Sequence, residues 1–532
     1  MNGCKVQKKR RSLPHGVMFN AYPDSIGKNL ADTVQLLKRP ELQQAFSMFY
    51  LLPTVFNSDL DRGFSIIDYN LNTELVKPRD LKEMQNLGIM LKLDLVLNHL
   101  SVNSPQFEDL LTKGQESEYD EFFIDWNKFW EGYGTAGADG WIIPDREHRE
   151  KLFTRKPGLP VMRINIADGS QRYFWNTFYQ KIMRQGRKER YLGQLDLNAR
   201  SEKVWIFYKE TLQKIKSYGA GIVRLDAFAY LHKVPGEANF FNRPGTWDYL
   251  ERLEQTARCY DLIVLPEIHA EYGSGLYREI AAREYPFYDF FLPGLVIDAL
   301  ESSSAEKLLD WADEISREGY RTINMLGCHD GIPLLDLKGK DIQGSYQPGL
   351  LSDRRIDALV DLIVARGGRI KDIYDAEGKI ITYYQVNATF FSALGEDDSK
   401  MLLARAIQLF MPGTPQVWYL DLFAGKNDYE AADRGGTAGH KEINRTNLSL
   451  GQVKDDLKRP VVIDQLEMIR LRNNSPAFSG SFETDRGCLP HLLKLSWQNL
   501  DCRVTLSANL KTYSFIIEEI NGEAGRTFRY NR

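Results

Sequence analysis

Cysteine is scarce in this chain, and its few copies form no recognisable framework. The 532 residues contain five cysteines, at Cys4, Cys259, Cys328, Cys488 and Cys502. The number is odd, and no group of them has the spacing of metal ligands. Such usage is typical of a reduced protein, so we expect a cytoplasmic one that needs no metal and no cofactor.

Long apolar runs are missing as well. No stretch reaches the roughly 18 apolar residues that a membrane-spanning helix needs. The start of the chain, MNGCKVQKKRRSLPHG, is basic but lacks the apolar core of a secretory signal. We therefore expect neither a membrane anchor nor export.

Neither sign of charge dominates. The 68 Lys and Arg residues nearly balance the 72 Asp and Glu residues, which leaves a formal net charge of −4. A nucleic-acid-binding protein needs a broad basic surface, and this balance does not predict one. We expect small-molecule partners, and either a monomer or a homodimer.

Four short segments each end an apolar run in an acidic or imidazole side chain. They are DLVLNH at 94–99, GIVRLD at 221–226, IVLPE at 263–267 and GCHD at 327–330. Runs rich in Val, Ile and Leu are typical of strands buried on both faces of a parallel sheet. In strand–helix barrels, catalytic residues gather at the carboxyl ends of such strands.

This pattern predicts that Asp226, Glu267 and Asp330 converge in one pocket. Clustered carboxylates raise one another's pKa, so one can stay protonated while another remains ionised. The alternative for each single residue is structural, because an Asp after a strand is often a helix cap. The joint occurrence in one order favours the site.

The same segments resemble the conserved blocks of the α-amylase superfamily, glycoside hydrolase family 13, over most of the chain. Five further segments resemble its sucrose phosphorylase branch, which also includes phosphorylases of sucrose 6'-phosphate, glucosylglycerol and glucosylglycerate. These segments are AYPDSIG at 21–27, QLDLN at 194–198, YYQVN at 383–387, GTPQVWYLDLFAGKND at 413–428 and EINR at 442–445.

The resemblance implies an α/β fold, a (β/α)8 TIM barrel with an inserted domain after strand 3, a second small insertion and a C-terminal antiparallel β-domain. The irregular, aromatic-rich stretch after His99 is too long for a single loop, which agrees with an inserted domain. The expected division is barrel at 1–100, 199–331 and 396–475, inserted domain at 101–198, small insertion at 332–395 and β-domain at 476–532.

The resemblance also assigns catalytic roles. Asp226 is the expected nucleophile, Glu267 the general acid/base, and Asp330 the residue that stabilises the transition state. A nucleophile and an acid about 5 Å apart are the geometry of a retaining mechanism. Arg224, two residues before Asp226 on the same strand, is expected to keep that carboxylate ionised.

Further residues are expected to bind the glucosyl ring. His99 and His329 match hydrogen-bond donors to its hydroxyls, Asp61 and Phe64 grip its far end, and Tyr230 matches an aromatic platform. The alternative for the two aromatic residues is ordinary core packing. Lys441 stands where the branch has the Arg that pairs with Asp61, while Arg445 is retained, so which cation serves the pocket stays open.

For phosphate, the segment FTRKPGLP supplies Arg155 and Lys156, in the inserted domain. The resembled loop carries a phosphate-binding Arg, and here Lys156 stands at that place with Arg155 one residue earlier. The alternative is an ordinary solvated basic turn. An enzyme of this kind takes a small carbohydrate and inorganic phosphate as substrates.

The acceptor is expected to meet Tyr384 and Gln385. A tyrosine before the Gln argues against a phosphorylated acceptor, so phosphorolysis of 2-O-α-glucosylglycerol to α-glucose 1-phosphate and glycerol is favoured. Sucrose or sucrose 6'-phosphate phosphorolysis comes next. An α-glucosidase or transglucosidase of the same fold, and a non-catalytic binding protein, are the remaining alternatives; the retained carboxylates argue against the last.

Overall fold

The computed structural model describes residues 11–156, 158–185, 188–374, 380–487 and 489–530. Within these ranges the side chains of residues 184–185, 188–189, 371–374, 380–384 and 436–438 are not described. The basic start of the chain and Cys488 lie outside the described residues.

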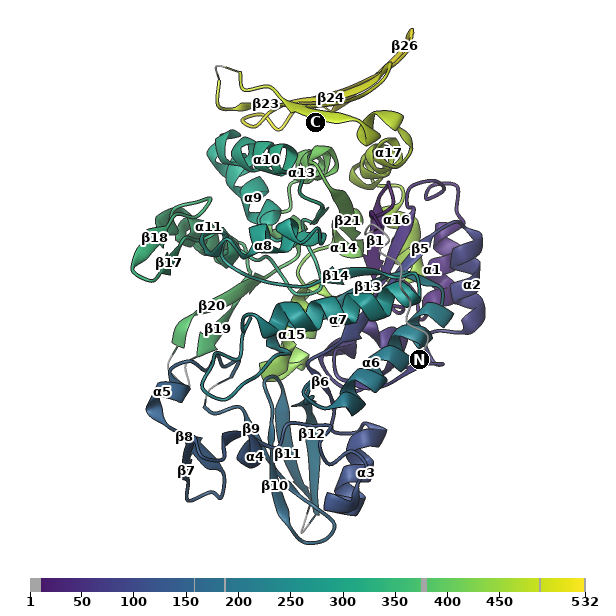
Figure 1. The fold of residues 1–532 in the computed structure, drawn as a ribbon. Coiled ribbons are helices and arrows are strands. Elements are labelled where there is room, and N and C mark those ends of the chain that lie inside the picture. The colour runs from purple at the N-terminus through teal and green to yellow at the C-terminus, as the bar shows by residue number, and fades with distance from the viewer. Residues whose placement is uncertain (1–10, 157, 186–187, 375–379, 488, 531–532) are drawn as a thin grey trace.

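Eight parallel strands form a nearly closed barrel at the centre of the molecule (Figure 1). The sheet runs in the order β14-β13-β5-β2-β1-β21-β16-β15. Its strands are buried almost throughout, which explains why their sequences are apolar on both faces. The predicted (β/α)8 barrel is confirmed. The strands are β1 (Met18–Ala21), β2 (Met48–Leu51), β5 (Met90–Val96), β13 (Ala220–Asp226), β14 (Ile263–Pro266), β15 (Phe287–Asp289), β16 (Thr322–Asn324) and β21 (Thr414–Trp418).

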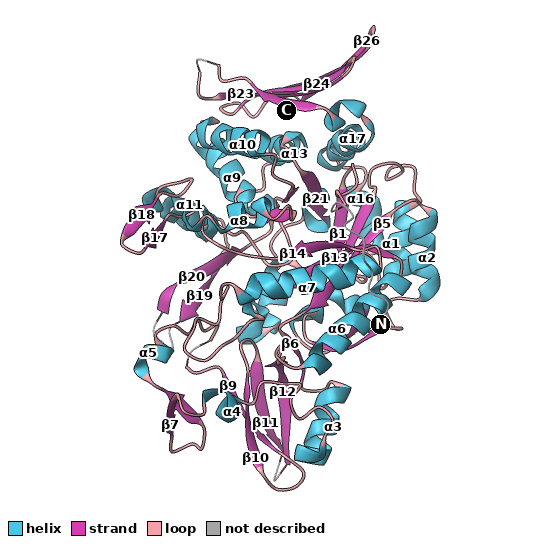
Figure 2. Cartoon of the chain, in the orientation of Figure 1, coloured by secondary structure: helices cyan, strands magenta, loops and turns pink. Residues whose placement is uncertain are grey.

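Helices cover the outside of the barrel, as Figure 2 shows in cyan. In α6 the apolar residues Val204, Leu212 and Ile215 recur at helical spacing and are buried against the core. The helices outside the two insertions are α1 (Leu30–Leu37), α2 (Pro78–Asn86), α6 (Glu202–Ser217), α7 (Gly245–Cys259), α8 (Leu276–Ala282), α9 (Leu292–Ser302), α10 (Glu306–Glu318), α13 (Asp398–Phe410), α14 (Tyr419–Leu422), α15 (Tyr429–Arg434), α16 (Leu450–Asp456) and α17 (Pro460–Asn474).

The segment between β5 and α6 leaves the barrel and forms a separate lobe (Figure 1). It has its own small core, in which Trp126, Trp130 and Trp175 pack together. Its last strand returns to pair with its first, so the lobe begins and ends beside the barrel. Its elements are β6 (His99–Ser101), α3 (Pro105–Lys113), α4 (Trp126–Trp130), β7 (Gly134–Ala136), β8 (Ile142–Pro144), α5 (Arg146–Arg149), β9 (Val161–Asn165), β10 (Gln171–Trp175), β11 (Gln180–Gln185) and β12 (Lys188–Asp196).

Two further additions complete the fold. A second insertion follows β16, and a five-stranded antiparallel sheet ends the chain on the opposite side of the barrel from the lobe (Figure 1). Trp497 anchors that sheet by donating to the carbonyl of Phe410 at 2.7 Å. The insertion contains β17 (Lys340–Ile342), β18 (Ser345–Gln347), α11 (Asp353–Ala365), β19 (Arg369–Tyr374), β20 (Ile380–Asn387) and α12 (Phe390–Ala393). The terminal sheet contains β22 (Ser481–Thr484), β23 (Leu492–Asn499), β24 (Cys502–Asn509), β25 (Phe515–Asn521) and β26 (Ala524–Tyr530). A short hairpin of β3 (Phe56–Ser58) and β4 (Ile66–Leu71) follows β2.

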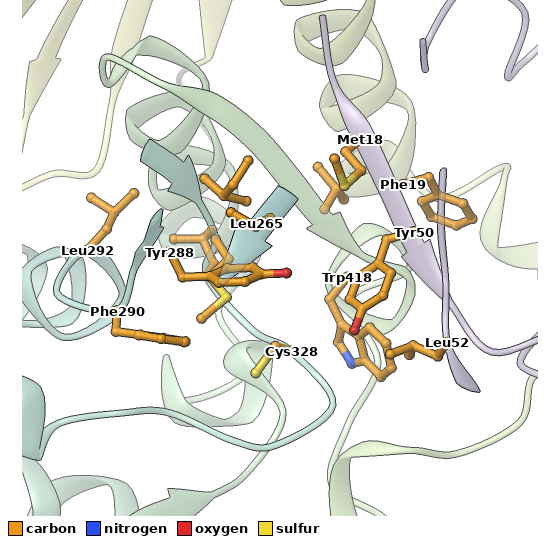
Figure 3. Packing of buried hydrophobic residues seen from close by; sticks show 14 of the residues in the cluster. Met18, Phe19, Tyr50, Leu52, Leu265, Tyr288, Phe290, Leu292, Cys328 and Trp418 are labelled. Carbon is orange, nitrogen blue, oxygen red and sulfur yellow. The ribbon is translucent and has the colours of Figure 1, made fainter. Parts of the chain in front are cut away.

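Aromatic rings line the barrel interior near its carboxyl end, and Figure 3 shows Tyr50, Tyr288 and Trp418 among them. A buried lysine, Lys92, lies between two of these rings. Its ammonium group donates to the Tyr288 hydroxyl at 2.5 Å and lies 3.7 Å from the centre of the Tyr50 ring. This layer closes the barrel beneath the strand ends. Among the described residues, no helix is long and apolar enough to cross a membrane.

Candidate active site

Three carboxyl groups meet above this aromatic layer. Asp226 is the last residue of β13, Glu267 directly follows β14, and Asp330 lies in the loop after β16. All three are largely buried, with side-chain exposures of 11%, 12% and 14%. The carboxyl ends of parallel strands share one edge, which is why residues so distant in sequence come together. The residue after Asp226, Ala227, has φ 51°, a strained conformation of the kind often found at functional sites.

Arg224 bridges the carboxylates. One guanidinium nitrogen, Nη1, lies 2.6 Å from Asp94 Oδ1 and 2.9 Å from Asp226 Oδ1. The other, Nη2, lies 2.5 Å from Glu267 Oε1. The contact with Asp226 is the predicted one. The contacts with Glu267 and Asp94 were not predicted, although Asp94 belongs to the DLVLNH segment. Tyr50 completes the group by donating to Asp94 at 3.0 Å.

The surroundings shift the pKa values of Asp226 and Glu267 in opposite directions. Burial, assisted by the charges of Glu267, Asp94 and Asp330, raises the pKa of Asp226 well above its usual range despite Arg224. Burial also disfavours ionised Glu267, but Arg224 and His269 outweigh it and lower the pKa of Glu267. Because its pKa is lowered, Glu267 can act as a general acid only if a neighbouring group supplies a proton.

Asp330 is held by two cations. Lys441 donates directly to Asp330 Oδ1, and Arg445 Nη2 lies 3.8 Å from the same oxygen. Both cations also approach Asp61, at 3.9 Å and 3.6 Å. Burial would raise the pKa of Asp330, yet the charges of Lys441 and Arg445 hold it well below its usual range. Lys441 thus lies closer to Asp330 than to Asp61, the partner that the sequence suggests.

The two predicted histidines, His99 and His329, are both buried at the site. His99 Nε2 lies 2.9 Å from the carbonyl oxygen of Phe64, and burial lowers the pKa of this imidazole. Burial also lowers the pKa of His329 to about 3. The Phe64 ring stacks on His329 with centres 4.9 Å apart, so one face of this predicted sugar contact is covered by the imidazole. Both histidines lie at the site that the sequence predicts for them.

The predicted aromatic platform, Tyr230, lies between the lobe and the barrel. Its ring contacts Phe178 and Phe240 at centre distances of 5.3 Å and 5.1 Å. Burial raises the pKa of its hydroxyl, which hydrogen-bonds Arg155 of the lobe. Arg155 also lies 5.7 Å from the centre of the Phe178 ring.

The next residue, Lys156, is less available to bind an anion. Lys156 donates to the amide oxygen of Asn176, and burial lowers its pKa to about 7. Arg155 is therefore the better placed cation of the predicted pair, because it reaches Tyr230 at the site while Lys156 is engaged within the lobe.

The second insertion supplies the predicted acceptor residues. Gln385 is 2% exposed, and its side-chain amide donates to the backbone carbonyl of Asp330. Asn387 donates to the same carbonyl at 2.5 Å. These bonds fix the loop that carries Asp330. The side chain of Tyr384 lies outside the described residues.

One pair was missed altogether. His269, in the LPEIH segment, lies 3.7 Å from Glu267 and 3.4 Å from Asp336 of the second insertion. The sequence signal was the imidazole two residues after the acid, but its partner, Asp336, comes from a distant loop. Among the described residues, no group of three or more His, Cys, Asp or Glu side chains could hold a metal ion.

Comparison with known proteins identifies the family. No family model matches the chain. Over 511 residues, however, it is 59% identical to a sucrose 6(F)-phosphate phosphorylase of Ilumatobacter coccineus, covering 96% of each chain. The chain belongs to the sucrose phosphorylase branch of the α-amylase superfamily. It is thus a glycosyltransferase-type phosphorylase, as the resemblance predicts.

Other relatives of this phosphorylase agree. It is 31% identical over 522 residues to a glucosylglycerol phosphorylase of Marinobacter adhaerens, covering 97% of this chain and 98% of the other. The crystal structure of sucrose 6F-phosphate phosphorylase from Thermoanaerobacter thermosaccharolyticum is 33% identical, covers 98% of both chains and has a TM-score of 0.85. The fold and the family are therefore shared from end to end.

Proposed function

We propose that this phosphorylase cleaves sucrose 6'-phosphate with inorganic phosphate, giving α-glucose 1-phosphate and fructose 6-phosphate. The observation that carries the proposal is the 59% identity, over 96% of each chain, to a protein with this named activity. The identity to a glucosylglycerol phosphorylase is 31%, so the comparisons do not support the preference for glucosylglycerol. The argument for that preference depended on the side chain of Tyr384, which lies outside the described residues.

We infer a double displacement in which Asp226 attacks the anomeric carbon while Glu267 protonates the leaving oxygen. The position of both carboxyl groups on one guanidinium supports this inference, because Arg224 fixes their separation and orientation. Phosphate then attacks the glucosyl-enzyme, and Glu267 accepts its proton. Two inversions at the same carbon retain the α configuration.

The remaining site residues have proposed roles that follow from their contacts. Asp330, held by Lys441, binds sugar hydroxyls and opposes the charge of the transition state. His99 and His329 present uncharged imidazoles to the sugar, since burial lowers the pKa of each. Arg155 provides the charge that attracts phosphate, a planar donor suited to phosphate oxygens.

An acceptor screen tests the substrate. The enzyme is incubated with α-glucose 1-phosphate and one of fructose 6-phosphate, fructose, glycerol or glycerate, and phosphate release is measured. We expect the highest kcat/KM with fructose 6-phosphate, by about tenfold or more, because a phosphoryl group adds charged contacts. A higher value with glycerol or fructose would overturn the proposed substrate.

A second measurement tests the class of reaction. Sucrose 6'-phosphate is supplied with and without phosphate, and both free glucose and glucose 1-phosphate are followed by NMR. A phosphorylase forms α-glucose 1-phosphate only when phosphate is present. Equal release of free glucose in both samples would identify a hydrolase instead, and β-glucose 1-phosphate would contradict retention.

A further inference from the structure

His269 is fixed between two carboxylates. Its Nε2 lies 3.7 Å from Glu267 Oε1, and its Nδ1 lies 3.4 Å from Asp336 Oδ2. The imidazole stacks on Phe290 with ring centres 3.6 Å apart and planes inclined by 19°. Stacking fixes the plane of the ring, so one nitrogen faces each carboxylate.

Asp336 belongs to a short 3₁₀ turn, Leu335–Leu337, at the start of the second insertion. Its side chain is 8% exposed, and it also accepts a hydrogen bond from the backbone N–H of Ala270. The insertion therefore fixes the residues that follow Glu267.

The charges that face His269 come from several elements. Glu267 follows β14 as His269 does, Asp330 follows β16, and Asp336 belongs to the second insertion. Glu271, a little further along the chain after β14, lies near Asp336. Arg224 on β13 acts through Glu267. Burial opposes a charge on His269, but the carboxylates outweigh it and raise the pKa of the imidazole.

We propose that His269, supported by Asp336, is a positioning residue that holds the proton which Glu267 delivers to the leaving oxygen. The inference rests on the role proposed for Glu267. Arg224 lies 2.5 Å from Glu267 and favours its ionised form, so a neighbouring group has to supply the proton that Glu267 delivers. The 3.7 Å separation exceeds a hydrogen bond, and such catalytic contacts shorten when substrate binds.

Over one turnover, His269 gives up one proton and regains one. The proton passes from His269 Nε2 to Glu267 and then to the leaving oxygen, as the bond from that oxygen to the anomeric carbon breaks and the bond to Asp226 forms. In the second half, an oxygen of hydrogen phosphate attacks the same carbon, and the bond to Asp226 breaks. The proton of hydrogen phosphate returns through Glu267 to His269.

The test compares His269→Gln and Asp336→Asn with the wild type. Asp341→Asn is the matched control, because Asp341 lies exposed in the same insertion and accepts a hydrogen bond from the backbone N–H of Gly344 at 2.8 Å. Two donors are used. Sucrose 6'-phosphate needs protonation of its leaving oxygen, whereas α-glucosyl fluoride does not.

We expect both variants to lower the first-turnover rate with sucrose 6'-phosphate about tenfold or more, and that with α-glucosyl fluoride less than about twofold. In a plot of kcat/KM against pH, the loss of activity on the alkaline side should begin about one pH unit lower. The reason is that each variant weakens the group that holds the proton for Glu267. Equal losses on both donors, or an unmoved basic limb, would overturn the proposal.

Two further measurements keep the result decisive. Melting temperatures show whether Asp336→Asn folds; if it does not, His269→Gln decides the question alone. Glu267→Gln is measured beside them, because its full activity on sucrose 6'-phosphate would refute the proposed role of Glu267 independently. If sucrose 6'-phosphate is not a substrate, the glucoside of the best acceptor in the screen replaces it as donor. The measurement with α-glucosyl fluoride stays the same.

Discussion

The two sides of the active site are built differently. On the side proposed to hold the glucosyl ring, Asp330, Lys441 and Arg445 form an ion-paired group with side-chain exposures of 14%, 14% and 1%. On the side proposed for the acceptor and phosphate, Arg155 comes from the lobe and Asp336 from the second insertion. The first side is attached to the barrel's strand ends, while the second depends on segments added to the barrel.

This difference has a functional meaning. In the proposed reaction the glucosyl ring is common to the substrate and the product, so the groups that hold it can be rigid and permanently charged. What attacks and what leaves must vary, and the insertions can vary without disturbing the barrel. Four substitutions or conditions test this division of labour.

The largest effect is expected where both sides meet, at Asp226. Replacing it with Asn removes the nucleophile, so turnover with any donor should fall by at least about 10⁴-fold while the fold remains intact. Steady-state rates with sucrose 6'-phosphate and with α-glucosyl fluoride measure this. Activity above a few per cent with either donor would exclude Asp226 as the nucleophile.

On the glucosyl side, Lys441→Met should lower kcat/KM about 100-fold and equally for all acceptors, because it leaves Asp330 with a single, more distant cation. The matched control is Lys340→Met, since Lys340 pairs with Glu271 at 3.0 Å and is 47% exposed. The acceptor screen provides the measurement. A loss confined to one acceptor would show that Lys441 belongs to the other side.

On the acceptor side, Arg155→Ala should raise the KM for phosphate about tenfold and leave the first turnover of α-glucosyl fluoride unchanged. The reason is that Arg155 faces the site from the lobe, where it hydrogen-bonds Tyr230. Arg146→Ala, in an exposed pair with Glu150, is the control. An unchanged KM for phosphate would refute this assignment.

The smallest effect is expected on the stability of the fold. The direction in which that stability changes with pH differs between Asp330 and His269. The pKa of Asp330 is lowered by folding, so its contribution is present above the unfolded value of about 3.9 and is lost as pH falls through the folded pKa. The pKa of His269 is raised, so its contribution is present below the unfolded value of about 6.5 and is lost as pH rises through the folded pKa.

Melting temperatures of three proteins check this linkage across pH. Lys441→Met should differ from the wild type by several degrees near neutral pH, and the difference should shrink in acid. His269→Gln should show the opposite trend, with its largest difference below about pH 6.5. The same trend for both variants would contradict the contrast between the two sides.

The sequence predicts the barrel and its carboxylate cluster because both depend on local patterns. Apolar runs that end in Asp226 and Glu267 predict buried strands, and parallel strands bring their carboxyl ends together. The contact between Arg224 and Asp226 follows equally from their spacing on one strand, and it is present at 2.9 Å.

Other contacts have no local signal. The proximity of Lys441 to Asp330 depends on two loops whose meeting no periodicity encodes, and Asp336 reaches His269 from an insertion. Arg224 could have been expected to serve Asp226 alone, but its second nitrogen lies on Glu267. Differences of a few ångströms in the position of a cation decide which of several nearby carboxylates it contacts.

The sequence by itself therefore determined the barrel, the family and the three carboxyl groups at its strand ends. Only the tertiary structure decided which cation lies closest to Asp330 and that His269 lies between Glu267 and Asp336. The physical reason is distance. Side-chain periodicity and buried strands are encoded over a few neighbouring residues, whereas Coulombic partners are fixed by the folded positions of loops far apart in the chain.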